Sequence, residues 1–290
     1  MPMDKTKIDE SFFKNLKEKY KGIDFYFSLS FFSIKLKLNE DVFDVFSKKF
    51  KNQKNEFFVE PKIFKSPINN FNYLIGNPAI YNIDFKENKN KFIFYAYNFA
   101  SILNLKKQSD CILALGQEKK EIIANEIENF LRVYSSIILP NYDSILFHSS
   151  AVLTKKGAFV FFGNSGAGKS TIANIFKSEN FKVLSDDLNI LILKNGLQIT
   201  SSPFLSEINQ AEEGVFPVKK IFYLKKDKEN FIEKISPIQQ KSYLFASIPV
   251  LNSIKFYHNE MFSKVSKIIN YNEVEILHFK KDKELIKCLQ

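Results

Sequence analysis

The sequence predicts a mostly β (α+β) domain over residues 1–143, followed by an α/β domain over residues 144–290. Residues 25–38 end in a clean alternation of apolar and polar side chains, which is typical of a half-buried strand. Two short apolar runs between residues 145 and 162 have the composition of buried strands, and a helical pattern follows them. Pro140–Asp143 breaks the preceding helical pattern, so we expect the domain boundary there.

The first domain is expected to be an antiparallel β assembly. Residues 4–21 are charged and compatible with a helix, and apolar residues recur at three-to-four spacing over residues 119–138, which predicts a second helix. Asn-rich segments between the apolar runs indicate turns. The strand-like runs are Phe57–Val59, Tyr73–Ile75, Ala79–Phe85, Lys91–Tyr97 and Ile112–Leu115.

The second domain alternates strands and helices. Strands over Ile145–Leu153 and Ala158–Phe162 are expected to precede a helix over about 169–178. Asn195 and Gly196 favour a hairpin turn between the runs that flank them. The remaining predicted strands are Phe181–Ser185, Leu188–Leu193, Leu197–Thr200, Lys219–Leu224 and Val274–Phe279. Helices are expected near 237–247 and 252–269, with a short helix at the end.

Residues Gly163–Ser170 read Gly-Asn-Ser-Gly-Ala-Gly-Lys-Ser and match the P-loop (Walker A) pattern G-x-x-x-x-G-K-[ST] at every position. Glycines allow the tight turn that points backbone amides at phosphate oxygens, and the following helix adds its positive end. Lys169 is expected to reach the β- and γ-phosphates, and Ser170 to offer its hydroxyl to Mg²⁺. The residues predicted to bind a nucleoside triphosphate are Gly163, Asn164, Ser165, Gly166, Ala167, Gly168, Lys169, Ser170 and Thr171.

Asp186 and Asp187 follow the predicted strand Phe181–Ser185, at the end of the strand where ligands bind in open α/β sheets. One carboxylate suits Mg²⁺ and the other can accept a proton from an attacking hydroxyl, although a solvated Asp-Asp turn is the alternative interpretation. His148 interrupts an apolar strand, where a lone histidine is more often a core residue than a catalytic one. His258 and His278 are expected to be structural.

Charge and composition restrict the partners. The net charge is +10, but Arg132 is the only arginine, so almost no guanidinium group is available to make paired hydrogen bonds to guanine. The lysines also alternate with acidic residues at Lys225–Glu229 and Lys280–Glu284, as on a solvated face. We therefore do not expect nucleic acid as a partner; the surplus suits an acidic protein or an anionic nucleotide.

The remaining sequence features point to a cytoplasmic protein. Cys111 and Cys288 are the only cysteines and lie far apart in the sequence, which fits neither a disulfide scaffold nor a zinc site. We therefore expect both to be small buried hydrophobic residues. The first residues carry no apolar signal core, and no apolar run reaches the 18 residues that would predict a membrane span.

His148, the loop Gly163–Ser170 and the pair Asp186-Asp187 together resemble the catalytic domain of HPr kinase/phosphorylase, which is akin to the nucleotide-binding core of phosphoenolpyruvate carboxykinase. The order and spacing agree, since His148 lies 21 residues before Lys169 and Asp187 lies 18 after it. Ser201–Phe204 further resembles a segment of HPr kinase-related proteins found beside peptide-modification genes. The resemblance covers about 145–290, with motifs only over 145–205.

The resemblance implies a kinase, a phosphotransferase that uses ATP and Mg²⁺ to phosphorylate a hydroxyl, such as a Ser side chain of a protein or peptide. Asp187 would be the base, and the acid of any reverse reaction, with His148 near the transferred phosphoryl group. Lys169 would hold the phosphates. Ser170 would bind Mg²⁺, and Asp186 is the second metal-binding residue that we expect.

The sequence departs from that family in four ways. The downstream magnesium-binding acid has no clear counterpart among Glu207, Glu212 and Glu213. No arginine follows Arg132, so the family's late arginine is missing or replaced by a lysine such as Lys241. Residue 171 is Thr where the family tends to have Glu, and the first domain does not match the family's regulatory domain. A non-catalytic nucleotide-binding module and a nucleotide hydrolase therefore stay open as alternatives, as do the acceptor, the nucleotide and homo-oligomer formation.

Overall fold

The computed structural model describes residues 8–66, 83–96, 98–116, 119–204 and 213–289. The chain divides into two compact units, Met1–Tyr134 and Ser135–Gln290. Both contain helices and sheets, so the predicted mixed α/β character is confirmed at this level. Helix α3 (Lys120–Ile138) crosses the division, which lies nine residues before the boundary predicted after Asp143.

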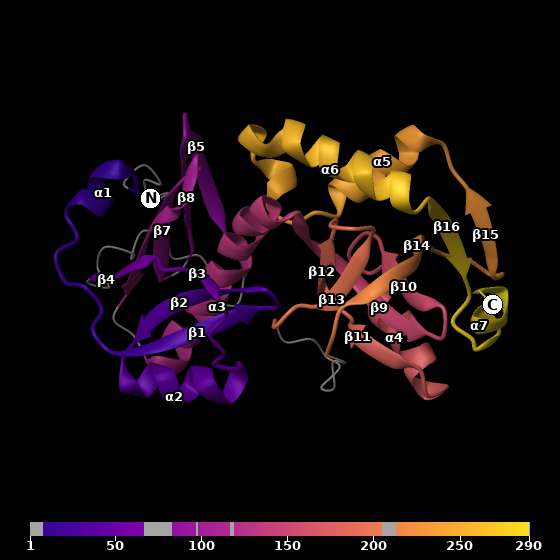
Figure 1. The fold of residues 1–290 in the computed structure, drawn as a ribbon, viewed down its shortest axis with the longest axis horizontal. Coiled ribbons are helices and arrows are strands. Elements are labelled where there is room, and N and C mark those ends of the chain that lie inside the picture. Colours follow the sequence, from indigo (N-terminus) through magenta and orange to yellow (C-terminus); the bar gives the residue numbers. More distant parts are fainter. Residues whose placement is uncertain (1–7, 67–82, 97, 117–118, 205–212, 290) are drawn as a thin grey trace, which may run out of the picture. The chain divides into compact units, whose positions relative to one another are not determined.

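The first unit contains two sheets, ordered β1-β2-β3 and β4-β8-β7-β6-β5 (Figure 1). Most pairings are antiparallel, but β3 joins β2 and β4 joins β8 in parallel, so the expectation of an antiparallel assembly is wrong at these two places. Besides α3, the elements of this unit are α1 (Glu10–Lys14), β1 (Ile23–Leu29), β2 (Phe32–Leu38), α2 (Glu40–Lys49), β3 (Phe57–Val59), β4 (Lys62–Ser66), β5 (Asp84–Asn88), β6 (Lys91–Tyr95), β7 (Phe99–Asn104) and β8 (Lys107–Gly116).

Phenylalanines form much of the core of this unit. Phe46 of α2 packs edge-on against Phe25 of β1, with ring centroids 5.0 Å apart. Phe130 of α3 stacks on Phe94 of β6 at 5.9 Å. Aromatic pairs of this kind add stability beyond the area that they bury, so each helix is fixed to its own sheet.

The predicted elements of the first unit are confirmed in part. The run 25–38 is a hairpin and not one strand, because Ser30 has a φ of 66° and the chain reverses there. Of the helix predicted over 4–21, the described residues from 8 onward contain only α1, and α2, β4 and β7 were not predicted. The run Tyr73–Ile75 and most of Ala79–Phe85 lie outside the described residues.

The second unit is built on one large sheet with the path β10-β9-β12-β13-β14-β16-β15, in which β11 pairs with β9 and β10 also pairs with β14. Strands β10, β14 and β16 are mutually parallel, and the other pairings are antiparallel. Its elements are η3 (Leu139–Tyr142), β9 (Ser144–Thr154), β10 (Gly157–Phe162), α4 (Lys169–Ser178), β11 (Lys182–Ser185), β12 (Leu188–Ile192), β13 (Gln198–Ser201), β14 (Phe216–Lys226), β15 (Phe231–Lys234), α5 (Pro237–Ala246), η4 (Leu251–Ser253), η5 (Lys255–Tyr257), α6 (His258–Tyr271), β16 (Val274–Phe279) and α7 (Glu284–Leu289).

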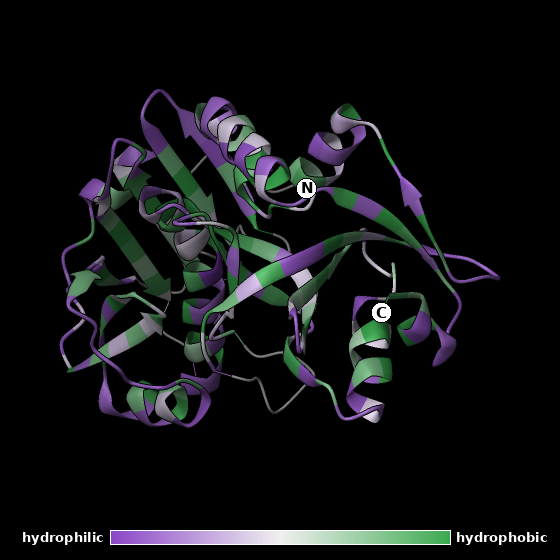
Figure 2. Ribbon diagram, turned by 45° about the vertical axis from the view of Figure 1, so that its right-hand side comes forward, coloured by the Kyte–Doolittle hydropathy of each residue, from purple (hydrophilic) through white to green (hydrophobic). Residues whose placement is uncertain are grey.

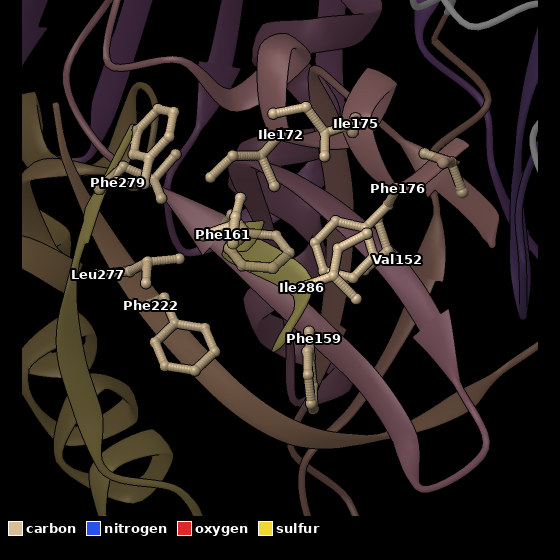
Figure 3. Close-up of a cluster of buried hydrophobic side chains, with 14 residues drawn as sticks. Val152, Phe159, Phe161, Ile172, Ile175, Phe176, Phe222, Leu277, Phe279 and Ile286 are labelled. Carbon is tan, nitrogen blue, oxygen red and sulfur yellow. The ribbon is translucent and has the colours of Figure 1, made fainter. Parts of the chain in front are cut away.

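Helices cover both faces of this sheet. Figure 3 shows the cluster on one face, where α4 and α7 bury Phe176 and Ile286 against Phe161, Phe222 and Leu277 of the strands. On the opposite face, the Tyr243 ring of α5 stacks on Tyr223 of β14 at 4.0 Å, and α6 packs against α5. Figure 2 shows hydrophobic residues along these strands, as burial on both faces requires.

Most predictions for this unit are confirmed, including β9, β10, α4 and the β12–β13 hairpin. The helix predicted from residue 252 begins instead at His258, after the two 3₁₀ turns η4 and η5. Strand β15 was not predicted. Within the described ranges, no helix combines the length and apolar character that crossing a membrane requires.

Glu126 of α3 makes the stability of the chain sensitive to pH. Its side chain is 8% exposed, and burial raises the pKa of Glu126 to about 7 from an ordinary value of 4.5. A carboxyl whose pKa is raised by folding contributes its full stability below its unfolded pKa and loses it as the pH rises through the folded value. We expect the free energy of unfolding to fall by up to ~3 kcal/mol between pH 4.5 and pH 8 from this group.

Glu126→Gln removes the charge that burial disfavours, so the variant should lose this part of the pH dependence and be more stable than the parent at pH 8. Urea unfolding followed by circular dichroism at pH 5 and pH 8 measures the difference. Glu121→Gln, on the exposed side of the same helix, is the control and should follow the parent. If the free energy of unfolding changed equally between pH 5 and pH 8 in all three proteins, Glu126 would not be the source of the pH dependence.

Candidate functional site

The pairing of strand β9 changes next to His148. Its first half pairs with β12, placing His148 opposite Leu188. Its second half pairs with both β11 and β10, and the last residue of β10, Phe162, lies opposite the residue after His148. The loop Gly163–Ser170 begins directly after Phe162, and Asp187 directly precedes Leu188. The register of β9 therefore brings three separate segments to one place on the sheet.

These segments surround a pocket of about 580 Å³. It contains every predicted catalytic and metal-binding residue, and most of the predicted loop residues. The members Gly163, Asn164 and Ala167 belong to the loop but do not line the pocket. The lining residues are His148, Ser165, Gly166, Gly168, Lys169, Ser170, Thr171, Asp186, Asp187 and Lys226.

The loop has a conformation and a packing that require glycine. Gly166 and Gly168 have φ values of 75° and 106°, in the left-handed region that side chains disfavour. A Cβ on Gly168 would lie 2.5 Å from the Phe279 ring of β16, closer than atoms can approach. The amide of Ala167 donates to the carbonyl oxygen of Asn164 at 3.0 Å, which closes the turn.

Helix α4 begins without a side-chain cap from any described residue, since its N-cap is Gly168. By contrast, Asn39 caps α2 and Ser236 caps α5 through their side chains. The first amides of a helix have no partner within the helix, and the helix dipole makes this end positive. The start of α4 is therefore suited to bind an anion in the pocket.

Lys169 places a desolvated ammonium group in this pocket. Its side chain is 7% exposed, and Nζ donates to the carbonyl oxygens of Gly163 at 3.2 Å and Asn164 at 3.4 Å. Burial lowers the pKa of Lys169 below its ordinary value, and the negative charge of Asp187 opposes that shift. A buried cation held mainly by neutral carbonyls gains most from a bound polyanion.

Asp187 and His148 form a pair on the side of the pocket that is open to solvent. His148 Nε2 lies 3.4 Å from Asp187 Oδ1, and the two side chains are 40% and 38% exposed. The carbonyl oxygen of Asp187 accepts a hydrogen bond from the amide of Ser149 at 3.0 Å, which ties the aspartate to β9. The interpretation of His148 as a core residue is wrong, because its side chain lines the pocket.

The other two histidines have structural surroundings. His258 Nε2 lies 3.0 Å from the carbonyl oxygen of Asn252. His278 lies between Asp227 and Glu233, with contacts of 2.9 and 2.8 Å. Neither histidine is among the residues that line the pocket.

The buried carboxylate of Asp186 is suited to hold a cation. Its side chain is 3% exposed, and its Oδ1 has no hydrogen-bond partner among the described residues. An unpaired buried carboxylate oxygen is costly unless a ligand satisfies it. Ser170 lines the same pocket, so two oxygen donors of the kind that Mg²⁺ prefers are available.

The described residues contain no group of three or more His, Cys, Asp or Glu side chains able to hold a metal. Mg²⁺ is usually held by one or two side chains together with water and phosphate oxygens, a requirement that Ser170 and Asp186 can meet. Among the downstream acids, Glu213 is exposed and is not one of the residues that line the pocket. Glu207 and Glu212 lie outside the described residues.

Lys226 is the pocket residue that the sequence analysis missed. It ends β14, which runs parallel to β10, so its side chain comes to the same end of the sheet as the loop. Lys241, suggested as a substitute for the missing arginine, is exposed on α5 and is not a lining residue. The signal for Lys226 was its place at the carboxyl end of a parallel strand.

No protein-family model matches the chain, and no curated protein matches it. The chemistry of the pocket therefore has to be inferred from its own side chains. The resemblance to HPr kinase/phosphorylase stays a prediction.

We expect Lys169→Met to weaken the binding of inorganic tripolyphosphate tenfold or more, because the variant lacks the ammonium group of the anion site. The melting temperature without ligand should not fall, since the substitution removes a desolvated charge and keeps the aliphatic stem. Calorimetry and thermal unfolding measure the two effects. Lys177→Met, in the last turn of the same helix, should bind like the parent, and equal affinity in all three proteins would refute the anion site.

Proposed function

We propose that the chain is an ATP- and Mg²⁺-dependent kinase that transfers a phosphoryl group to a hydroxyl, such as a Ser side chain of a protein or peptide. The observation that carries this proposal is the single pocket in which Lys169, Ser170 and Asp186 lie together with the pair Asp187 and His148. The first three are suited to bind Mg²⁺ and the phosphates of a donor, and the pair can supply a proton acceptor beside them.

The proposal includes a finer fold assignment, in which the second unit is a P-loop catalytic domain like that of HPr kinase and phosphoenolpyruvate carboxykinase. Three features support it: the order β10, loop and α4, the uncapped start of α4, and the position of Asp187 one residue before β12. An ordinary glycine-rich turn between a strand and a helix has no need of a buried lysine at its end.

The donor would be held by charge and by backbone amides. The amides at the start of α4 and the ammonium of Lys169 suit the β- and γ-phosphates. Lys226 adds a second cation from β14. It would take the part that a late arginine plays in the family, as a point charge without the bidentate geometry of a guanidinium.

In the transfer step, the acceptor oxygen forms a bond to the γ-phosphorus while the bond from that phosphorus to the β–γ bridging oxygen breaks, and ADP leaves. Asp187 accepts the proton of the acceptor hydroxyl at a carboxylate oxygen. His148, 3.4 Å from Asp187 Oδ1, orients that carboxylate toward the pocket. Positioning and charge neutralisation supply most of the rate enhancement in reactions of this class.

Mg²⁺ would be held by Ser170 and the unpaired Oδ1 of Asp186, with water and phosphate oxygens completing its ligands. When bound, it neutralises charge on the phosphate oxygens. Asp186 is buried and Asp187 is partly exposed, and this difference supports a division of roles. The buried carboxylate serves the metal, and the accessible one meets the acceptor.

A second candidate is hydrolysis of the same nucleotide. The partial exposure of Asp187 and His148 supports it, because water reaches the carboxylate as readily as a hydroxyl does. Measuring ADP and free phosphate separately distinguishes the two activities: transfer yields ADP without an equal amount of phosphate, and hydrolysis yields both equally. A parent that binds Mg-ATP and forms no ADP would favour a non-catalytic nucleotide-binding module.

We expect Asp187→Asn to bind ATP at least as tightly as the parent, because it removes a negative charge near the phosphates. Transfer should fall on the order of 10²-fold or more, since the amide cannot accept the proton. The assay measures ADP formation and acceptor phosphorylation with proteins and peptides encoded beside this gene. Glu179→Gln removes an exposed carboxylate outside the pocket and should match the parent; parental transfer by Asp187→Asn would exclude it as the base.

Asp186→Asn should uncouple Mg²⁺ from ATP binding. In the parent, ATP should bind more tightly with Mg²⁺ than with a chelator, and the variant should lose about tenfold of that difference because one ligand has lost its charge. Calorimetry with and without Mg²⁺ measures the coupling independently of turnover. An unchanged coupling would move the metal away from Asp186.

A further inference from the structure

A second pocket, of about 470 Å³, lies on the sheet face covered by α4 and α7. Its apolar residues come from β10, from the end of α4 and the segment after it, and from α7, and its polar rim comes from the β9–β10 turn and β14. The lining residues are Thr154, Lys155, Lys156, Phe159, Phe176, Phe181, Lys219, Lys220, Ile286 and Leu289. The phosphate pocket and its residues are separate from this one.

The floor of this second pocket belongs to the packed core. Phe159, Phe176 and Ile286 are members of the cluster in Figure 3, where Phe159 lies at the end far from Phe279. Phe181 packs edge-on against Phe176 at 5.1 Å and remains half-buried. The buried members Phe159, Phe176 and Ile286 thus form a fixed base, and the apolar surface left half-buried in the pocket comes from Phe181 and Leu289.

The rim of the pocket is basic. Lys220 pairs with Glu275 at 2.8 Å, but Lys155, Lys156 and Lys219 are exposed and form no ion pair with a described residue. Three cations at one edge of an apolar hollow repel one another unless an anion joins them. The rim therefore offers positive charge that no ion pair among the described residues compensates.

Backbone packing fixes the rim over the floor. Gly157, with a φ of 125°, lies so close to β14 that a Cβ there would be 2.7 Å from the carbonyl oxygen of Pro217 and 3.4 Å from Cβ of Lys219. The turn that carries Lys155 and Lys156 is thus held against β14. In the same pairing, Phe159 lies opposite Lys220 in parallel register, so an aromatic ring and a lysine stem share one face.

We propose that this pocket binds a small amphipathic carboxylate, with its apolar chain on the phenylalanine floor and its carboxylate at the lysine rim. The volume lies in the range of small-molecule sites. An uncharged hydrophobe would leave the lysines unpaired, and a compact polyanion would leave the half-buried Phe181 and Leu289 uncovered. Only a ligand with both parts satisfies both surfaces. This site does not depend on the kinase proposal.

Octanoate is the probe and octylamine, with the same chain and the opposite charge, is its matched control. Calorimetry should give one octanoate per chain, bound at least tenfold more tightly than octylamine. Lys219→Glu should weaken octanoate tenfold or more by reversing a rim charge. Lys194→Glu makes the same change in net charge at the exposed β12–β13 turn, outside the pocket, and should bind octanoate like the parent.

Tripolyphosphate affinity, measured on the same variants, verifies that the fold and the phosphate pocket are intact. A loss of octanoate binding in Lys219→Glu with that affinity retained supports the proposal. No octanoate binding at millimolar concentration, equal binding of octanoate and octylamine, or equal effects of Lys219→Glu and Lys194→Glu would each overturn it. The last two results would assign the binding to chain length alone or to net charge alone.

Discussion

The register of β9 is the constraint on which the candidate site depends. One half of this strand is paired with β12 and the other with both β10 and β11, and β12 begins at the level of β9 where β10 ends. Because side chains alternate across a strand, a shift of one residue would turn His148 to the other face and separate it from Asp187. The site is therefore specified by long-range pairing, with the loop supplying chemistry that the sheet positions.

The pocket concentrates groups that folding alone does not favour. Lys169 is a buried cation and Asp186 a buried carboxylate with an oxygen lacking a partner among the described residues. Each costs free energy that the apolar cluster beneath α4 must offset. Local rules for stability are commonly broken where a ligand is bound, so this combination is more informative than the motif by itself.

The features that could be predicted from the sequence are those set by interactions between residues close together in the chain. The loop and α4 were predictable because glycines and a 3.6-residue period act over a few residues. Lys226 was missed because only the pairing of β14 with β10 brings it to the loop. His148 was ambiguous for the same reason, since its apolar neighbours in the sequence fit a core strand. The hairpin at Ser30 was missed because no Gly or Asn marks that turn.

The contact between Gly168 and Phe279 has a consequence for the order of folding. Chains are synthesised from the N-terminus, so β16 leaves the ribosome after the loop and β14 have done so. Until then the loop has its glycines and its lysine but no ring packed against it, and β14 has no strand on its outer side. A nascent or truncated chain would carry the complete motif in an unsupported form. The supported conformation of the loop is thereby tied to the synthesis of β16.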